Sequence, residues 1–199
     1  MNEKGILIII SGPSGSGKGT VVEKLKADPS YALSISATTR QPRNYEQDGV
    51  HYFFKSTDEF KKMIEEGKLL EWAEFCGNFY GTPKDYVMGK LDEGLNVILE
   101  IEVQGAAQIK KIFPEAVTVF LIPPDKEELR KRLIGRGTED MDTVEKRLKR
   151  ASEEIELLPH YDFVVVNDTV ENAVKRINTV VKAAKMGSQR YIDKIKEFK

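Results

Sequence analysis

Residues 6–20 read ILIIISGPSGSGKGT, an apolar run that passes through a glycine-rich loop into a helical pattern. Gly12, Gly17 and Lys18 fit the pattern GxxxxGK, in which backbone N–H groups turn inward around a phosphate. The N-terminus of the following helix adds the positive end of its dipole, and Lys18 adds a point charge. This order of strand, loop and helix predicts a chain that folds around a parallel sheet and binds a nucleoside triphosphate.

The loop departs from the full pattern at one position. Gly19 stands where serine or threonine is usual, and Thr20 comes one residue late. Position 19 therefore offers no side-chain hydroxyl to a metal ion. The residues expected to surround the triphosphate are Gly12, Pro13, Ser14, Gly15, Ser16, Gly17, Lys18, Gly19 and Thr20.

Short apolar runs rich in β-branched residues predict strands that are buried on both faces. There are five such runs, at 6–10, 33–36, 97–101, 117–122 and 163–166. Helical patterns separate most of them, including those at 20–26 and 125–133. The alternation predicts an α/β fold with a parallel sheet, whose ligands bind beyond the carboxyl ends of the strands.

Two stretches interrupt this alternation. Residues 37–95 hold short aromatic pieces around one helix, with Thr57 as its expected N-cap and Gly67 just past its end, and we interpret them as an inserted subdomain. Residues 130–156 are highly charged and predict a mobile helical flap. The core of a single domain of 199 residues would then comprise 1–36, 96–129 and 157–199.

The composition excludes several classes of function. The 31 Lys and Arg residues balance 32 Asp and Glu residues, so the net charge gives no reason to expect nucleic acid or an anionic membrane as a partner. No apolar run approaches the roughly 18 residues of a membrane helix. Cys76 is the only cysteine, which excludes an internal disulfide and a cysteine metal site. We therefore expect a soluble, cytoplasmic protein, and we assign neither His51 nor His160 to chemistry.

The segment SATTRQPR, residues 36–43, leaves the second predicted strand at its carboxyl end. Arg40 and Arg43 stand three residues apart with Pro42 between them. This stiff arrangement can present two forked guanidinium groups to one phosphate. Taken alone, the segment would more simply be a loop with two solvated arginines.

The chain resembles the guanylate kinase family of ATP:GMP phosphotransferases over nearly its whole length. The matching segments stand in the family's order and spacing: SGPSGSGKGT, SATTRQPR, DGVHYFF, LLEWAEFCGNFYGTP, ILEIEVQGA, RLIGRGTE and FVVVND. The resemblance implies a three-layer P-loop core with a five-stranded parallel sheet, a mixed α/β GMP-binding subdomain at 37–95 and a helical lid at 130–156. It also implies transfer of the γ-phosphoryl group of ATP to GMP, and to dGMP, in purine nucleotide metabolism.

By this resemblance, five side chains contact the phosphate of GMP, and each offers a donor suited to an oxyanion. They are Ser36, Arg40, Arg43, Tyr52 and Tyr80. The alternative for the two tyrosines is that they are ordinary core aromatic residues.

The resemblance also assigns the guanine base to a carboxylate. Glu71 would accept from guanine N1–H and N2–H₂ together, with Ser36 and Thr82 helping around the base. Adenine lacks that donor pair, so Glu71 would set base choice, unless it is an ordinary exposed glutamate. Glu102 is expected to bind guanine or metal-bound water, and Glu100, two residues earlier in the strand, faces the same side. Many relatives carry Asp at both positions.

The attacking atom would be a phosphate oxygen of GMP, already anionic near neutral pH, so no general base is required. The resemblance assigns positioning and charge stabilisation to Lys18, Arg40, Arg43, Arg132, Arg136 and Arg147. The last three lie in the charged flap, where the alternative is a solvated helix. Mg²⁺ is the expected cofactor, held by ATP and water rather than by a side chain, with Thr20 or Glu102 orienting the waters.

Two other functions fit parts of the pattern. A guanylate-kinase-like interaction domain would keep the fold, lack catalysis and bind partner peptides, but the complete loop and both acceptor arginines favour an enzyme. A sister P-loop kinase would use another phosphorylated acceptor, but Glu71, Tyr52 and Tyr80 favour GMP. The sequence leaves the oligomeric state open.

Overall fold

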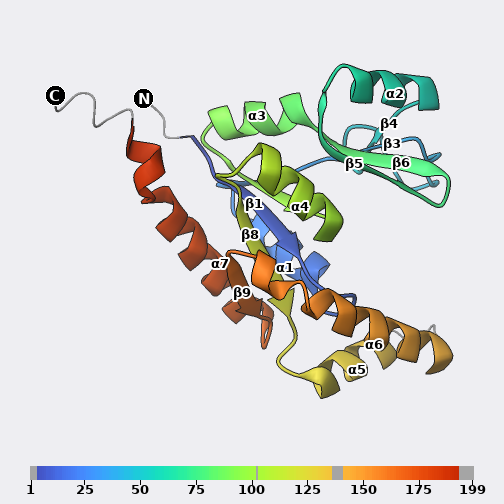
Figure 1. Ribbon diagram of the computed structural model, residues 1–199, viewed down its shortest axis with the longest axis vertical. Helices are drawn as coiled ribbons and strands as arrows, with labels where there is room; N and C mark the ends of the chain where they lie inside the picture. Colours follow the sequence, from blue (N-terminus) through green and yellow to red (C-terminus); the bar gives the residue numbers. More distant parts are fainter. Residues whose placement is uncertain (1–3, 102, 136–140, 193–199) are drawn as a thin grey trace. The chain divides into compact units, whose positions relative to one another are not determined.

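The structure, a computed structural model, describes residues 4–101, 103–135 and 141–192 (Figure 1). The strands are β1 (Leu7–Ser11), β2 (Tyr31–Leu33), β3 (Ala37–Thr38), β4 (Phe53–Phe54), β5 (Leu69–Phe75), β6 (Asn78–Pro83), β7 (Asn96–Glu100), β8 (Val117–Ile122) and β9 (Phe163–Val166). The α-helices are α1 (Lys18–Lys26), α2 (Thr57–Glu65), α3 (Lys84–Asp92), α4 (Val103–Ile112), α5 (Lys126–Ile134), α6 (Met141–Ile155) and α7 (Val170–Lys185). None of the helices in these ranges has the length and low polarity needed to cross a membrane.

The larger sheet has the strand order β2-β7-β1-β8-β9. Strands β2 and β7 pair in parallel, as do β8 and β9. Every residue of β1 is buried, and so are the first five residues of β8. Strands covered on both faces need no polar alternation, which explains their continuous apolar sequences. The predicted α/β fold with a five-stranded parallel sheet is confirmed.

The smaller sheet is mixed and has the order β4-β3-β6-β5. Strand β3 pairs in parallel with β4 and antiparallel with β6, and β5 and β6 form an antiparallel pair. Helix α2 covers this sheet through Phe60, which is fully buried and stacks on Phe79 of β6 at a ring-centroid distance of 5.6 Å (Figure 1). The aromatic pieces that interrupt the sequence pattern therefore form a small core of their own.

Two local predictions are wrong by a few residues. Helix α2 is capped by Ser56 rather than Thr57, because Ser56 and Glu59 form a reciprocal capping box. The second strand runs over Tyr31–Leu33 instead of 33–36. Its position is set by the buried ring of Tyr31 and by the pairing of residues 31–33 with 96–98.

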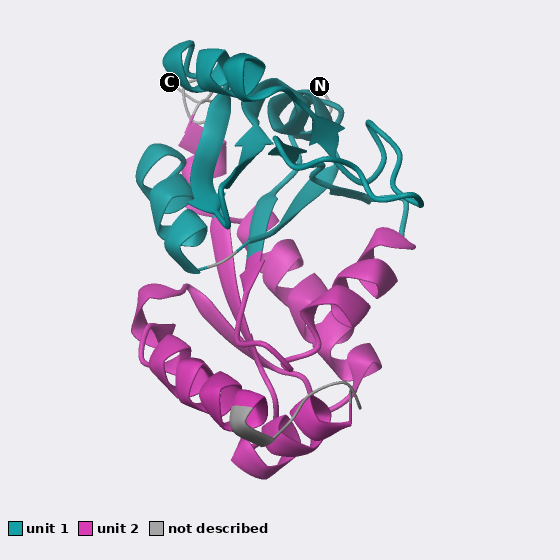
Figure 2. Ribbon diagram, turned by 90° about the vertical axis from the view of Figure 1, so that its right-hand side faces the viewer, with its two compact units in different colours: residues 1–9, 28–116 teal, residues 10–27, 117–199 magenta. Residues whose placement is uncertain are grey.

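The chain forms two compact units (Figure 2). Unit 1 comprises residues 1–9 and 28–116, and unit 2 comprises residues 10–27 and 117–199. The smaller sheet with α2, α3 and α4 belongs to unit 1, and α1, α5, α6 and α7 belong to unit 2. The division into a core, a subdomain at 37–95 and a lid at 130–156 follows other boundaries and stays a prediction.

Helices α5 and α6 share an apolar core despite their charged sequences. Leu129 and Leu133 of α5 meet Val144, Leu148 and Ala151 of α6, and each of the five is at most 5% exposed. The apolar residues of α6 recur at helical spacing, so one face of the helix is buried and the charges occupy the other.

Replacing Leu133 by alanine should destabilise unit 2 by about 2–5 kcal/mol, because the side chain is fully buried and its removal leaves a cavity. Thermal and urea unfolding measure the loss. Ile134→Ala is the matched control, since the neighbouring side chain is 46% exposed and should cost less than about 1 kcal/mol. Equal losses for the two variants would contradict the packing of α5 against α6.

Candidate active site

The predicted phosphate-binding loop connects β1 to α1 in unit 2. Gly12, Gly15 and Gly17 have φ angles of 147°, 88° and 87°, which L side chains rarely adopt. A Cβ at Gly12 would lie 2.1 Å from the carbonyl oxygen of Leu121, so the loop backbone lies directly against β8. Helix α1 begins at Lys18, and its first N–H groups are available to an anion.

Asn167 holds the loop from the end of β9. Its Nδ2 donates to the carbonyl of Ser16 at 2.8 Å, and the residue is 3% exposed. A Cβ at Gly17 would lie 2.4 Å from the same nitrogen, so the missing side chain makes room for the amide. The Lys18 ammonium donates to the carbonyl of Gly12 and so folds back across the loop.

Arg132 joins α5 to the base of the loop. Its Nε donates to the carboxylate of Glu128, one turn earlier, at 2.8 Å. Its Nη2 donates to the carbonyl of Asn167 at 2.9 Å, and Nη1 lies 3.4 Å from the carbonyl of Ser16. Of the other two predicted lid arginines, Arg147 is half-buried on α6 and Arg136 lies outside the described residues.

The predicted acceptor arginines lie in unit 1, in the loop after β3. Both terminal nitrogens of Arg40 donate to the Glu46 carboxylate, at 3.0 and 2.8 Å. The Arg40 guanidinium lies 5.4 Å from the ring centroid of Tyr52, and that ring lies 6.4 Å from the ring of Tyr80. The structure thus brings one arginine and both tyrosines of the predicted phosphate site together, and Arg43 follows in the same loop.

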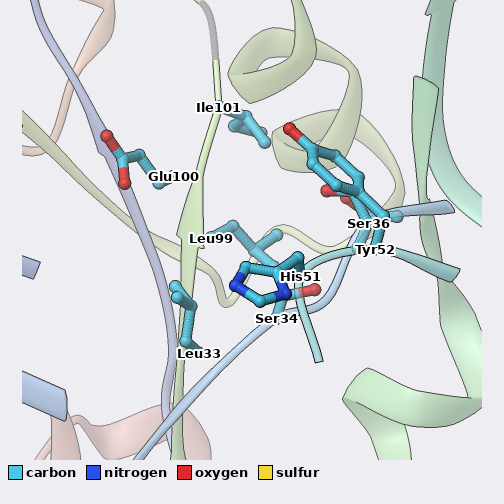
Figure 3. A pocket seen from close by; sticks show the side chains of 9 residues that line it. Leu33, Ser34, Ser36, His51, Tyr52, Leu99, Glu100 and Ile101 are labelled. Atoms are coloured by element: carbon cyan, nitrogen blue, oxygen red, sulfur yellow. The ribbon is translucent and has the colours of Figure 1, made fainter. Parts of the chain in front are cut away.

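A pocket of about 140 Å³ opens in unit 1 (Figure 3). Ser36, Tyr52 and Thr82 of the predicted GMP site line it, and so does Glu100 at the end of β7. Ser34 adds a hydroxyl whose oxygen is buried and has no hydrogen-bond partner among the described residues. The pocket therefore combines several hydroxyl groups with a carboxylate, as a polar ligand requires.

Glu71 lies half-buried in β5 and is joined to the pocket through Thr82, whose hydroxyl donates to Glu71 Oε1 at 2.7 Å. Helix α4 approaches so closely that a Cβ at Gly105 would lie 3.2 Å from Glu71 Oε2. Burial raises the pKa of Glu71, and the hydrogen bond from Thr82 acts in the opposite direction. A ligand with two adjacent N–H donors would compensate for the lost hydration of this carboxylate.

These residues are better suited to a metal ion that enters bound to the nucleotide than to one that protein side chains hold permanently. In the described part of the chain, no three His, Cys, Asp or Glu side chains lie together as a cation site. Thr20 is exposed in the first turn of α1, and a Cβ at the exposed Gly19 would meet nothing within 4 Å. Glu102 lies outside the described residues. Mg²⁺ accepts such a setting, because phosphate oxygens and waters are its usual ligands.

Sequence reasoning misses Glu46, Asn167 and His51. Glu46 is a charged loop residue of a kind that is usually solvated, although it follows Arg40 and Arg43 by six and three positions. Asn167 directly follows β9, at the sheet edge where ligands of parallel sheets bind, and this position could have identified it. His51 lines the pocket, and its Nδ1 accepts from the N–H of Gln47 at 3.0 Å.

Comparison with known proteins identifies the family to which this chain is similar. The family model described as "Guanylate kinase" matches residues 4–184. A guanylate kinase of Listeria monocytogenes is 52% identical over 200 residues, covering 100% of this chain and 98% of the relative. A guanylate kinase of Bacillus anthracis is 57% identical over 182 residues, covering 90% of this chain and 89% of the relative.

Solved structures include a similar fold. The crystal structure of guanylate kinase from Anaplasma phagocytophilum superposes with a TM-score of 0.73 at 33% sequence identity. The match covers 94% of this chain and 90% of that one.

Asn167→Ala should weaken ATP binding about tenfold, because it removes the buried hydrogen bond that holds the Ser16 carbonyl. Isothermal titration calorimetry gives the Kd. Asn172→Ala is the matched control, since this asparagine is exposed on α7 and should leave the Kd unchanged. An unchanged Kd for Asn167→Ala would mean that the loop holds its shape without the amide.

Proposed function

The chain belongs to the guanylate kinase family and phosphorylates GMP with ATP, and we propose that unit 1 binds the acceptor GMP while unit 2 binds the donor ATP. The observation that carries the assignment of the acceptor is Glu71, a half-buried carboxylate beside a polar pocket in the unit that also holds Arg40 and Arg43.

The donor site is formed by the loop and lid of unit 2. Residues 12–20 surround the ATP phosphates, which accept from the backbone N–H groups of the loop, Pro13 having none, and from the N-terminus of α1. Lys18 neutralises charge on the transferred group. Arg132 is already bound to the loop backbone and supports this site. Arg136 and Arg147 are proposed to add positive charge over the phosphates, as the resemblance implies.

The acceptor site is formed in unit 1. Arg40, Arg43, Tyr52 and Tyr80, together with Ser36, hold the GMP phosphate. The close approach of Arg40 to Tyr52, and of Tyr52 to Tyr80, supports this grouping. Guanidinium and phenol groups donate to an oxyanion, so they can aim one phosphate oxygen at the γ-phosphorus of ATP.

The guanine base is recognised by Glu71, with Ser36, Thr82 and Glu102 around it. Guanine presents N1–H and N2–H₂ side by side, and a carboxylate accepts from both. Thr82 donates to Oε1 of Glu71 only, and this hydrogen bond opposes the rise in the pKa of Glu71 that burial causes, so it favours the ionised form that accepts. AMP would leave this carboxylate with Thr82 as its one side-chain donor, which a half-buried charge tolerates poorly.

Catalysis is positioning and charge stabilisation. The GMP phosphate oxygen forms a bond to the γ-phosphorus as the bond to the β–γ bridging oxygen breaks, giving GDP and ADP. Mg²⁺ on ATP would supply further neutralisation of the phosphates, held by their oxygens and by waters that Thr20 or Glu102 orients. We further propose that dGMP is an acceptor and that the enzyme works in purine nucleotide metabolism in the cytoplasm, where its exposed Cys76 stays reduced.

Steady-state assays with ATP, Mg²⁺ and GMP, AMP, UMP or dTMP test the acceptor assignment, and GMP should give the highest kcat/KM. Glu71→Gln should lower kcat/KM for GMP by about 100-fold, because the amide turns a donor toward the donors of guanine. Activity with AMP should not fall in parallel, so discrimination decreases.

Glu74→Gln is the matched control, since Glu74 is exposed on the same strand. Preference of the wild-type enzyme for another acceptor would overturn the acceptor assignment. Unchanged GMP selectivity in Glu71→Gln would contradict only the role of Glu71 in base choice and would leave the acceptor assignment intact.

Gly19→Ser tests the metal assignment. The serine fits sterically, because a Cβ at this position meets nothing within 4 Å, and its hydroxyl supplies an oxygen where Gly19 has none. The Mg²⁺ concentration for half-maximal rate should fall, and Gly19→Ala controls for the added carbon. If both variants match the wild type, position 19 has no part in holding the ion.

A further inference from the structure

Glu46 lies in the loop after β3, which holds Arg40 and Arg43, and its side chain is only 5% exposed in the ion pair with Arg40. It follows two arginines of the proposed phosphate site but has no assigned part in the reaction. Its oxygens accept from Arg40 Nη1 at 3.0 Å, from Arg40 Nη2 at 2.8 Å and from the backbone N–H of Arg43 at 2.7 Å. A single carboxylate thus contacts both arginine residues.

The bonds to Glu46 use one edge of the Arg40 guanidinium. Nη1 gives its second proton to the carbonyl of Gln41 at 2.8 Å, so both Nη1 protons are engaged. A guanidinium carries five N–H donors, and a second fork is formed by Nε–H and the other Nη2–H. That second edge can take two oxygens of a phosphate while Glu46 stays in place.

Glu46 also shapes the chain around Arg43. Its backbone N–H donates to the Arg43 carbonyl at 2.9 Å, and its carboxylate accepts from the Arg43 N–H, so residues 43–46 form a closed turn. The Arg43 side chain leaves this turn and donates through Nη1 to the exposed Tyr45 hydroxyl at 2.9 Å. A phosphate can displace this single contact with a neutral hydroxyl more easily than it could displace an ion pair.

The negative charge of Glu46 stabilises the two neighbouring positive side chains. Arg40 and Arg43 repel each other, and a carboxylate between them offsets the repulsion before a phosphate arrives. The hydrogen bonds from Arg40, and then from Arg43, lower the pKa of Glu46 to about 2. The carboxylate is therefore ionised at every pH at which the enzyme would be assayed.

We propose that Glu46 is a positioning residue that fixes Arg40 and the 43–46 turn in the arrangement that receives the phosphate monoester of the acceptor. The proposal rests on the proposed function, because it assigns the acceptor phosphate to these arginines. Glu46 does not compete with the substrate, since it occupies the Nη1/Nη2 edge of Arg40 and makes no contact with Nε. Another side chain that hydrogen-bonds Arg40 is Tyr80, which is itself proposed to contact the phosphate. Binding the phosphate then requires little reorganisation of the loop.

Glu46→Gln tests the proposal, because the amide keeps the size of the side chain but turns an NH₂ group toward Arg40. KM for GMP should rise about tenfold, the effect of one lost charge-assisted hydrogen bond. KM for ATP should stay within about twofold, because donor binding uses other groups, and kcat at saturating GMP should change less than KM for GMP, because the bound phosphate itself holds the arginines. Glu46→Asp keeps the charge on a shorter side chain and should recover part of the affinity for GMP.

Calorimetric binding of GMP and guanosine separates the phosphate from the base. Glu46→Gln should weaken GMP binding and leave guanosine binding unchanged. Glu66→Gln is the matched control: this carboxylate accepts from Lys68 at 2.6 Å but is more exposed, and its loss should leave both ligands unaffected.

Tighter GMP binding in Glu46→Gln would overturn the proposal, because it would show that the carboxylate competes with phosphate. Equal losses for GMP and guanosine, or parallel changes in KM for ATP and kcat, would also overturn it, since they would indicate a purely structural role. A wild-type chain that binds GMP without phosphorylating it would contradict the proposed function alone. Normal turnover with unchanged GMP binding in Glu46→Gln would contradict this inference alone.

Discussion

The backbone of the phosphate-binding loop keeps its shape because neighbouring groups approach it at distances that only glycine permits. The Leu121 carbonyl occupies the space of a Cβ at Gly12, and the Asn167 amide occupies that of a Cβ at Gly17. Asn167 then satisfies the Ser16 carbonyl, which Arg132 also approaches. Buried carbonyls need hydrogen-bond partners when the N–H groups of a loop turn inward, so the proposed donor site depends on these contacts.

Three glutamates in the two units show how one functional group serves different purposes. Glu46 is paired with arginine and has a lowered pKa, so it acts as a fixed negative charge. Glu71 is desolvated with a single hydroxyl donor, and its raised pKa reflects a carboxylate that lacks full compensation. Glu128 forms an ion pair with Arg132 one helical turn away and aligns it with the loop. The surroundings of each carboxylate, rather than the residue type, determine which glutamate is already paired and which is left to bind a ligand.

The sequence predicts the parts of this protein that follow from local patterns. The parallel sheet, the position of the loop and the helices α1 and α5 can be read from apolar periodicity and glycine spacing. The predicted start of α2 and the predicted limits of β2 are wrong by one to three residues, because the Ser56 capping box and the buried Tyr31 outweigh the pattern. Capping by Ser56 is recognisable in retrospect from the SxxE spacing with Glu59.

The sequence could not predict contacts that depend on the folded chain. The hydrogen bond from Asn167 to Ser16 spans 151 positions, and although the place of Asn167 after β9 marks it as a candidate site residue, the sequence does not identify Ser16 as its partner. Glu46 stands close to its arginines in the sequence, yet its contacts with both of them depend on the turn at 43–46 that the folded chain forms. The family resemblance identifies the side chains expected to contact the substrates, but it does not identify the residues that hold those side chains in position. The roles of the substrate-binding residues, and the three-part division of the chain, stay predictions.

The separation between Ser16 and Asn167 also has a consequence for biosynthesis. Unit 1 draws most of its residues from one continuous stretch, 28–116, whereas unit 2 joins residues 10–27 to residues after 116. A ribosome adds about 5–20 residues per second, so the loop is exposed for roughly ten seconds before Asn167 is made. The nascent chain therefore completes the bond between Asn167 and Ser16 only near the end of translation, and fragments that stop before β9 lack it.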